Sequence, residues 1–177
     1  MTRPRVGRVG ARAAALLAVA VTAATQGCLY SFTAGAFPDY IRTIAILPFE
    51  NETSRLELTQ ELHDVLLREV PRSLGIRPAG EEVANAVLRG TITGYDVVTP
   101  SYRPSADGAR AEVLQRQVTI TLAVQLVDLV NNEILWESSG LVGQGEFLEL
   151  SETEDIGREI AIRLLQQRII DGAQSNW

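Results

Sequence analysis

The sequence predicts an α+β fold: a two-layer α/β sandwich in which two helices pack on one face of a mainly antiparallel sheet of four to five strands. Two segments, residues 55–70 and 151–169, carry apolar side chains at helical spacing. Between them, residues 113–129 alternate apolar and polar side chains, as in a strand that faces a core on one side only. Two amphipathic helices and a sheet with one apolar face are the parts of a two-layer domain.

The first 27 residues have the layout of a secretory signal peptide. Four arginines and no acidic residue precede an uninterrupted apolar run at residues 13–24. As a helix, this run would be about 18 Å long, whereas the hydrocarbon core of a membrane is about 30 Å thick. We therefore expect a cleaved signal peptide and not a membrane-spanning anchor.

Cys28, directly after this segment, is the only cysteine of the 177-residue chain. A single thiol cannot form an internal disulfide. The stretch Thr25-Gln26-Gly27-Cys28 resembles the lipobox of bacterial lipoproteins. The resemblance implies a covalent diacylglycerol and an N-acyl lipid on Cys28, with the chain cut just before it. Several acyl chains give stable membrane attachment, which one chain does not. A free thiol and ordinary signal cleavage are the alternatives.

The chain is expected to have four parts. The signal peptide spans residues 1–27, and a lipidated tether spans residues 28–41, where aromatic residues mix with glycine and proline. Residues 42–170 form a single α/β domain, which is long enough to bury a core of its own. A frayed tail follows at residues 171–177.

The domain is expected to begin with a strand and a helix. Residues 42–50 are apolar and lie between turn-forming residues, which predicts a buried strand. The stretch Ser54-Arg55-Leu56-Glu57 fits a capping box at the start of the helix at residues 55–70. Pro71 is expected to end this helix. A short strand is expected near residues 74–77.

Three further strands are expected to form a meander. They are predicted at residues 87–98, 113–129 and 133–141. Asn131 and Asn132 join the last two, because asparagine tolerates positive φ and favours turns. Trp136 is expected to pack on this hairpin.

The last element is expected to be a helix that starts at a second capping box. Ser151-Glu152-Thr153-Glu154 fits that motif. The helical spacing predicts a buried face made of Ile156, Ile160, Ala161 and Leu164. The predicted core of the domain is Ile46, Leu62, Leu66, Ile120, Leu122 and Ile160.

The sequence contains few of the residue patterns that catalytic sites require. After Cys28, 12 arginines and 22 acidic residues give a net charge of −10, which disfavours binding to nucleic acid. His63 is the only histidine, so a two-histidine metal site cannot form within one chain, and a structural role is expected for His63. The glycines between Gly140 and Gly145 have the wrong pattern for a phosphate-binding loop, and a strand end is expected there.

Acidic residues are densest near the start of the last helix. In principle, such a group could hold calcium or hydrolyse a glycosidic bond. Most of its members fall in the first turn of a helix, where the dipole favours negative charge, so a structural role is expected. The group consists of Glu146, Glu149, Glu152, Glu154 and Asp155. We expect no enzyme, no metal site and no cofactor, and a carboxylate-based hydrolase is the alternative from the enzyme class.

Two segments together resemble the LptE family of lipopolysaccharide-assembly lipoproteins. Residues 28–32, CLYSF, resemble a C-x-Y-x-F-like mature terminus, and residues 44–53, IAILPFENET, resemble a strand that ends in P-x-x-N-x-T. Residues 88–95, LRGTITGY, and the long strand after them are similar to the middle of the family. The resemblance covers essentially all of the chain after the signal peptide.

The resemblance implies a lipid-anchored protein in the inner leaflet of the outer membrane, facing the periplasm. Such proteins bind a β-barrel translocon of the LptD type, partly as a plug inside it, and help to deliver lipopolysaccharide to the outer leaflet. The strand IAILPFEN also resembles lipoproteins that activate peptidoglycan synthases and subunits of curli-type secretion channels. These two classes are the alternatives to the LptE family.

A contact with lipopolysaccharide requires a local basic patch, because the domain as a whole is acidic. The best candidate in the sequence is the loop and strand start that carry Tyr102, Arg103, Arg110 and Arg116. Arginine pairs with phosphate through two hydrogen bonds, and a tyrosine ring can cover acyl or sugar surface. A solvated hairpin loop, whose arginines keep an acidic protein soluble, is the alternative.

Overall fold

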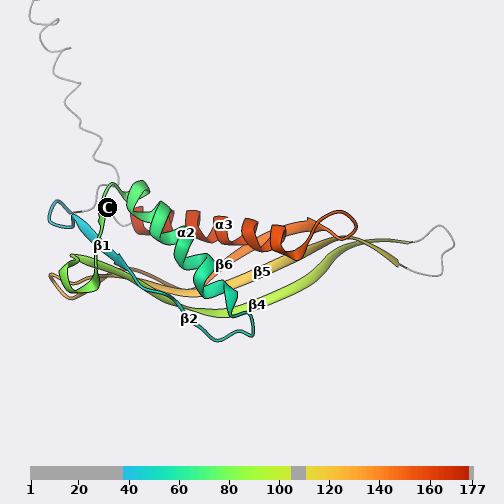
Figure 1. Cartoon of the computed structure of the whole chain (residues 1–177), viewed down its shortest axis with the longest axis horizontal. Coiled ribbons are helices and arrows are strands. Elements are labelled where there is room, and N and C mark those ends of the chain that lie inside the picture. The colour runs from blue at the N-terminus through green and yellow to red at the C-terminus, as the bar shows by residue number, and fades with distance from the viewer. Residues whose placement is uncertain (1–37, 105–110, 176–177) are drawn as a thin grey trace, which may run out of the picture. The chain divides into compact units, whose positions relative to one another are not determined.

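The computed structural model describes residues 38–104 and 111–175, and Figure 1 shows their arrangement. The chain begins with two short strands, and the helix α2 follows them. A third short strand, a 3-10 turn at Glu81–Val83, three long strands and the helix α3 complete the domain. The elements are β1 (Thr43–Ile46), β2 (Glu50–Asn51), α2 (Glu57–Leu74), β3 (Arg77–Pro78), β4 (Ala86–Pro104), β5 (Ala111–Asp128), β6 (Glu133–Leu148) and α3 (Glu154–Gln174).

These strands form one sheet in the order β3-β1-β4-β5-β6, and β2 also pairs with β4. The three long strands β4, β5 and β6 are antiparallel to one another. Strand β1 runs parallel to both of its neighbours, β3 and β4, because α2 carries the chain back over the sheet between them. Both helices lie on the same side of the sheet (Figure 1).

The predicted fold class is confirmed: the domain is α+β, with two helices on one face of the sheet. Two details differ from the prediction, since the sheet has six strands and is mixed. Two of the three long strands extend well beyond their predicted ends. Strand β6 reaches Leu148 where residue 141 was expected, and β4 reaches Pro104 where residue 98 was expected.

The helix α2 starts and ends differently from the prediction. Leu56 is its N-cap, and no side chain caps it, so the capping box at Ser54 does not form. Pro71 lies inside the helix, which continues to Leu74 and ends at Gly75 in a left-handed conformation (φ 69°). Pro71 is buried, and this burial offsets the backbone hydrogen bond that a proline cannot donate.

A turn built on Asn51 takes the place of the capping box before α2. The Oδ1 atom of Asn51 accepts hydrogen bonds from the backbone N–H of Thr53 (2.9 Å) and from its hydroxyl (2.8 Å). The Nδ2 atom of Asn51 donates to the carbonyl of Arg55 at 2.8 Å. The N-x-T pair of the sequence motif therefore acts structurally, by turning the chain from β2 into α2.

Glycines let α3 approach β6 closely. A Cβ atom at Gly145 would lie 1.9 Å from the carbonyl oxygen of Gly157, and one at Gly143 would lie 2.4 Å from that of Ala161. The prediction of a strand end at these glycines was wrong. They lie within β6, because only glycine leaves room for the helix backbone at this distance.

The helix α3 buries a different face from the predicted one. Thr153 is its N-cap, without a side-chain hydrogen bond, so the second capping box is also absent. Ile156 is 41% exposed and Ile160 is only half-buried. The buried residues of α3 are Gly157, Ala161, Ile162, Leu165, Ile169, Ile170 and Ala173. The helix also continues into the segment expected to be a frayed tail.

The core lies between the helices and the sheet. Five of the six predicted core residues are buried in it, and Ile160 is the exception. Trp136 on β6 packs against Gly172 of α3, where a Cβ atom would lie 2.3 Å from the ring. Asn132 adopts positive φ (55°) in the turn between β5 and β6, as predicted. Among the described residues, neither helix is apolar enough over its length to cross a membrane.

Candidate functional site

The face of the sheet opposite the helices carries mostly polar side chains. In β5, the even-numbered residues from Val118 to Leu126 are buried under the helices, so the odd-numbered ones face the other way. On this open face, β5 contributes Gln117, Thr119, Thr121 and Gln125. The prediction of a polar second face is thus met by a surface of hydroxyl and amide groups.

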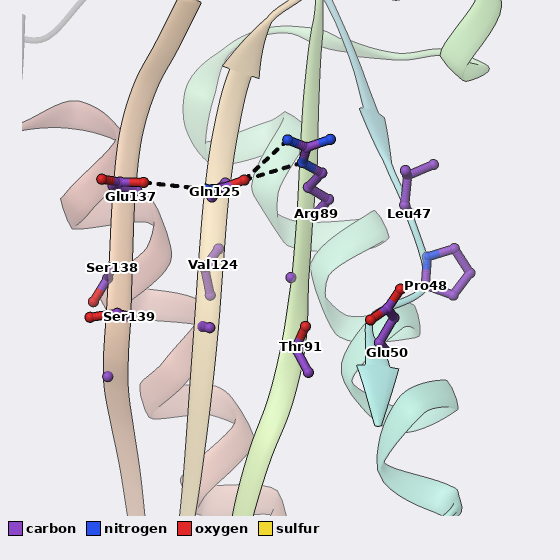
Figure 2. Close-up of a pocket in the computed structure, with 13 residues that line it drawn as sticks. Leu47, Pro48, Glu50, Arg89, Thr91, Val124, Gln125, Glu137, Ser138 and Ser139 are labelled. Carbon is purple, nitrogen blue, oxygen red and sulfur yellow. Dashed lines mark hydrogen bonds between the residues drawn. The ribbon is translucent and has the colours of Figure 1, made fainter. Parts of the chain in front are cut away.

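A ladder of three side chains crosses the open face from β4 to β6. Arg89 donates to Oε1 of Gln125 from Nε (3.3 Å) and from Nη2 (3.1 Å). Gln125 in turn donates from Nε2 to Oε2 of Glu137 at 3.2 Å. Figure 2 shows the three side chains in one row, at directly paired positions of neighbouring strands. Gln125 accepts hydrogen bonds through Oε1 and donates one through Nε2, so the orientation of its side-chain amide is fixed.

A trough of about 1000 Å³ surrounds this ladder. One wall comes from Leu47 and Pro48, after β1, and Glu50, at the start of β2, and the other comes from β6 (Figure 2). The β6 wall consists of Glu137, Ser138, Ser139 and Gly140. The trough is therefore open, has few charged groups and is rich in groups that both donate and accept hydrogen bonds.

The lining of the trough suits a polar, uncharged surface. Arg89 is its only cation, and Glu50 and Glu137 oppose it, so the trough has no excess of positive charge for phosphate. Its serine, threonine and glutamine groups can pair with backbone amides or with sugar hydroxyls. Leu47 and Pro48 add a small apolar area at one side.

This trough could not be predicted from the sequence. Its key residues come from three strands, and the strand pairing that brings them together cannot be read from spacing along the chain. The alternation of Gln125 with its apolar neighbours in β5 was a signal that it faces away from the core. The position of Arg89 opposite Gln125 follows from the register of β4 with β5.

The structure describes part of the predicted basic patch. Tyr102 and Arg103 lie in the outer part of β4, where Arg103 pairs in register with Glu112. Arg110 lies outside the described residues. Arg116, on β5, forms an ion pair with Glu149. This ion pair already occupies one of the three arginines, and the patch as a whole stays a prediction. Cys28 also lies outside the described residues.

The acidic residues near the start of α3 are engaged in structural contacts. Glu149 pairs with Arg116, and Asp155 pairs with Arg158 at 2.8 Å. Glu152 accepts a hydrogen bond from the backbone N–H of Leu148 at 2.7 Å. In the part of the chain that the structure describes, no three metal-ligating side chains come together.

A second polar network ties the helices to β4. Glu154, in the first turn of α3, accepts hydrogen bonds from the Tyr95 hydroxyl (2.6 Å) and from Arg55 (2.7 Å). Burial and the hydrogen bond to Glu154 raise the pKa of Tyr95 to about 12. Arg158 donates two hydrogen bonds to Glu61, which raise the pKa of its guanidinium further. The network fixes where the two helices begin relative to the long hairpin.

A third network holds the N-terminal end of the domain. Asp128 is fully buried at the end of β5 and accepts a hydrogen bond from the Tyr40 hydroxyl at 2.7 Å. It also accepts from the backbone N–H of Val130 (2.7 Å) and from the side chain of Asn131 (2.9 Å). Burial opposes ionisation of Asp128, but these hydrogen bonds outweigh it and lower the pKa of the carboxyl. Tyr40, expected in the tether, is thereby fixed to the sheet.

The fold and the trough define a small α+β domain, with one face of the sheet closed by helices and one face open. Its family is shown by sequence: residues 41–171 match the model of the family described as "LptE: Lipopolysaccharide-assembly". The chain belongs to the LptE family. No curated protein sequence matches it.

Solved structures share the fold at low sequence identity. The hypothetical protein CT253 from Chlamydia trachomatis is 10% identical, with a TM-score of 0.53, over 76% of this chain and 96% of that one. Protein XCC0632 from Xanthomonas campestris is 12% identical, with a TM-score of 0.50, over 78% and 85%. PelC from Paraburkholderia phytofirmans is 14% identical, with a TM-score of 0.49, over 77% and 88%. At these identities, the likeness concerns the fold alone.

Proposed function

We propose that this protein is an outer-membrane lipoprotein that binds a β-barrel translocon of the LptD type and assists lipopolysaccharide transport. The observation that carries the proposal is the LptE family match over residues 41–171. The protein would sit in the inner leaflet through lipids on Cys28 and face the periplasm. It would act by binding, without catalysis.

The lipid anchor is the first part of the proposal. The arginine-rich start, the apolar run and the Gly27-Cys28 junction support it. Cells are labelled with a fatty-acid analogue, and the wild type is compared with Cys28→Ser. We expect label in the wild type alone. Equal label in both proteins, or in neither, would remove the lipoprotein assignment.

The open-face trough is the second part, as the surface that meets the barrel. Its hydroxyl and amide groups suit the backbone and polar side chains of a protein partner better than phosphate. We expect Arg89→Glu to reduce copurification of the barrel from detergent-solubilised membranes. Arg77→Glu is the matched control, because Arg77 is also exposed and lies on β3, outside the trough lining.

The third part concerns lipopolysaccharide, whose phosphate groups pair well with arginine side chains. The candidates remain Tyr102 and Arg103 in the outer part of β4, Arg116 in β5, and Arg110, which lies outside the described residues. Arg103, Arg110 and Arg116 are replaced together with serine, and lipopolysaccharide binding and barrel copurification are measured separately. Because Arg116 is paired with Glu149, Arg116→Ser alone serves as the stability control.

The two sets of variants give distinguishable outcomes. Loss of lipid binding with the barrel complex intact would support the hairpin arginines as the lipid contact. Unchanged lipid binding would remove them from that role. If the tagged wild type brings down a peptidoglycan synthase, or only further copies of itself, and no barrel, the translocon proposal is wrong.

A further inference from the structure

Strand β6 forms one outer edge of the sheet along its whole length of 16 residues. Within the described residues, β5 is its only partner strand, so over residues 138–148 the backbone groups on its other side have no strand partner. An unpaired edge of this length is a template for another strand. Natural proteins usually protect such edges with charged residues, proline or very short strands.

The two edges of the sheet differ in this protection. The opposite edge is β3, which has only two residues, Arg77 and Pro78, both exposed. Residues 138–145 of β6, SSGLVGQG, contain no charge and no proline. Beside this stretch, Arg168 of α3 donates a hydrogen bond to the carbonyl of Val142 and so occupies one acceptor of the edge. The β6 edge is therefore much less protected than the β3 edge.

An apolar strip of α3 accompanies this edge. Ile160 and Leu164 lie eight and four residues before Arg168, so the three side chains share one side of the helix. Since Arg168 reaches β6, this side of α3 lies along β6. Ile160 and Leu164 are only half-buried, and Ile156, four residues earlier, is 41% exposed. These apolar side chains were expected in the core, and the fold leaves them at the edge instead.

We propose that the edge of β6 pairs with β6 of a second copy of this chain in a two-fold antiparallel arrangement. The sequence of the edge is compatible with itself. With Gly143 opposite Gly143 of the second copy, Val142 lies opposite Gln144, and Leu141 lies opposite Gly145. In this register Glu146 faces Gly140, and within residues 138–148 no carboxylate faces another; Glu137 falls opposite Glu149, just beyond the end of β6. Gly143 and Gly145 face α3 in each copy, so matching faces of the two sheets align.

The charge of the domain gives the proposed dimer a salt dependence. Each copy carries −10 after Cys28, and two such domains repel one another at long range. The uncharged edge adds no repulsion of its own. Salt screens the long-range repulsion, with a Debye length of about 10 Å at 0.1 M, and leaves strand pairing and apolar contact intact. Association should therefore strengthen as salt is raised.

Purified full-length protein in detergent, with empty micelles in large excess, is examined by sedimentation over a range of protein and salt concentrations. We expect a monomer–dimer equilibrium that shifts toward the dimer at high salt. Gln144→Lys should weaken it by about tenfold or more, because it places a lysine on each edge. Gln117→Lys, the same change on the open face of the central strand β5, should leave it unchanged.

Arg168→Ala is a variant for which we expect tighter association, in contrast to Gln144→Lys. It frees the carbonyl of Val142, so association should tighten several-fold, a result that misfolding does not produce. The register is tested by mixing one copy with Val142→Cys and one with Gln144→Cys. A mixed disulfide should form, because directly opposed residues lie about 4.5 to 5.5 Å apart at Cα, within the range that disulfides accept.

Two results would overturn the proposal. One is a protein that stays monomeric at every concentration and salt, including with Arg168→Ala. The other is a dimer that Gln144→Lys does not weaken. If the edge is instead occupied only by another envelope protein, and Gln144→Lys blocks that complex alone, the occupant is a foreign strand and the second-copy proposal fails. These outcomes do not depend on whether the proposed barrel partner is correct.

Discussion

The hydroxyl of Tyr95 on β4 donates a 2.6 Å hydrogen bond to Oε1 of Glu154 in the first turn of α3. Arg55 donates to the same oxygen at 2.7 Å and also lies 5.2 Å from the centre of the Tyr95 ring. One carboxylate thus joins the hairpin, the start of α2 and the start of α3. Hydrogen bonds to an ionised group are roughly twice as strong as neutral ones.

We expect Glu154→Gln to destabilise the domain by about 1 to 3 kcal/mol, because it removes the negative charge that accepts the hydrogen bonds of Tyr95 and Arg55. Urea unfolding measures this change. Glu159→Gln is the matched control. Glu159 pairs only with Arg163, both side chains are mostly exposed, and such surface pairs contribute about 0.5 kcal/mol or less. Equal loss in the two variants would show that the Glu154 network adds nothing beyond a surface pair.

The glycines of β6 permit a second comparison. Gly145→Ala would place a Cβ atom 1.9 Å from the carbonyl of Gly157, so α3 must move away from the sheet. We expect a loss of about 1 to 3 kcal/mol or more from this overpacking. At Gly140, in the same strand, nothing lies within 4 Å of the added atom. Thermal melts of Gly145→Ala and Gly140→Ala should therefore differ clearly, and similar melts would contradict the close approach of α3.

The helices and strands were largely predictable because their apolar periodicity reports local burial. Leu62 and Leu66 in α2, and Ile120 and Leu122 in β5, are buried as the pattern indicates. For α3, the apolar periodicity did not predict the buried face. There the glycines of β6 let the helix press its Gly157 and Ala161 face against the sheet, and Ile156 is left exposed. Close backbone approach depends on the partner strand, which the periodicity of the helix does not report.

Long-range pairing explains what else the sequence could not predict. Capping boxes were expected at Ser54 and Ser151, but the start of α2 is organised by Asn51, and Glu152 is used by the backbone of Leu148. The trough escaped prediction for the same reason, because Arg89 meets Gln125 only through strand pairing. The ion pair of Arg116 with Glu149 likewise depends on how the chain turns after β6.

Leu62 provides a direct test of the helix face of α2. It is 2% exposed in the core between α2 and the sheet, so Leu62→Ala should cost about 2 to 5 kcal/mol. Leu67, on the same helix, is 43% exposed, and Leu67→Ala should cost much less. Denaturant unfolding of the two variants makes the comparison at constant helix propensity. If Leu62→Ala unfolds like the wild type, the assigned face of α2 is wrong.

The buried carboxyl of Asp128 predicts a dependence of stability on pH. Its pKa in the folded state lies below its ordinary value of 3.8, because the hydrogen bonds from Tyr40, Val130 and Asn131 favour the charged form more than burial disfavours it. The group therefore stabilises the fold at pH values above its unfolded-state pKa, and this stabilisation is lost as the pH falls through its folded-state pKa. Asp128→Asn should remove this stabilisation by the carboxylate. It also places an NH₂ group next to the donors of Tyr40, Val130 and Asn131.

We expect Asp128→Asn to cost about 1 to 3 kcal/mol at neutral pH, since buried donors lose a charged acceptor. The loss should shrink at acidic pH, where the wild type also loses the carboxylate. Unfolding free energies of wild type and variant are measured from neutral pH down to the acid limit of folding. Glu82→Gln, an exposed acid in the 3-10 turn, should show no such convergence. A constant difference between wild type and Asp128→Asn at all pH values would mean that the Asp128 carboxylate charge does not stabilise the anchored Tyr40 end of the domain.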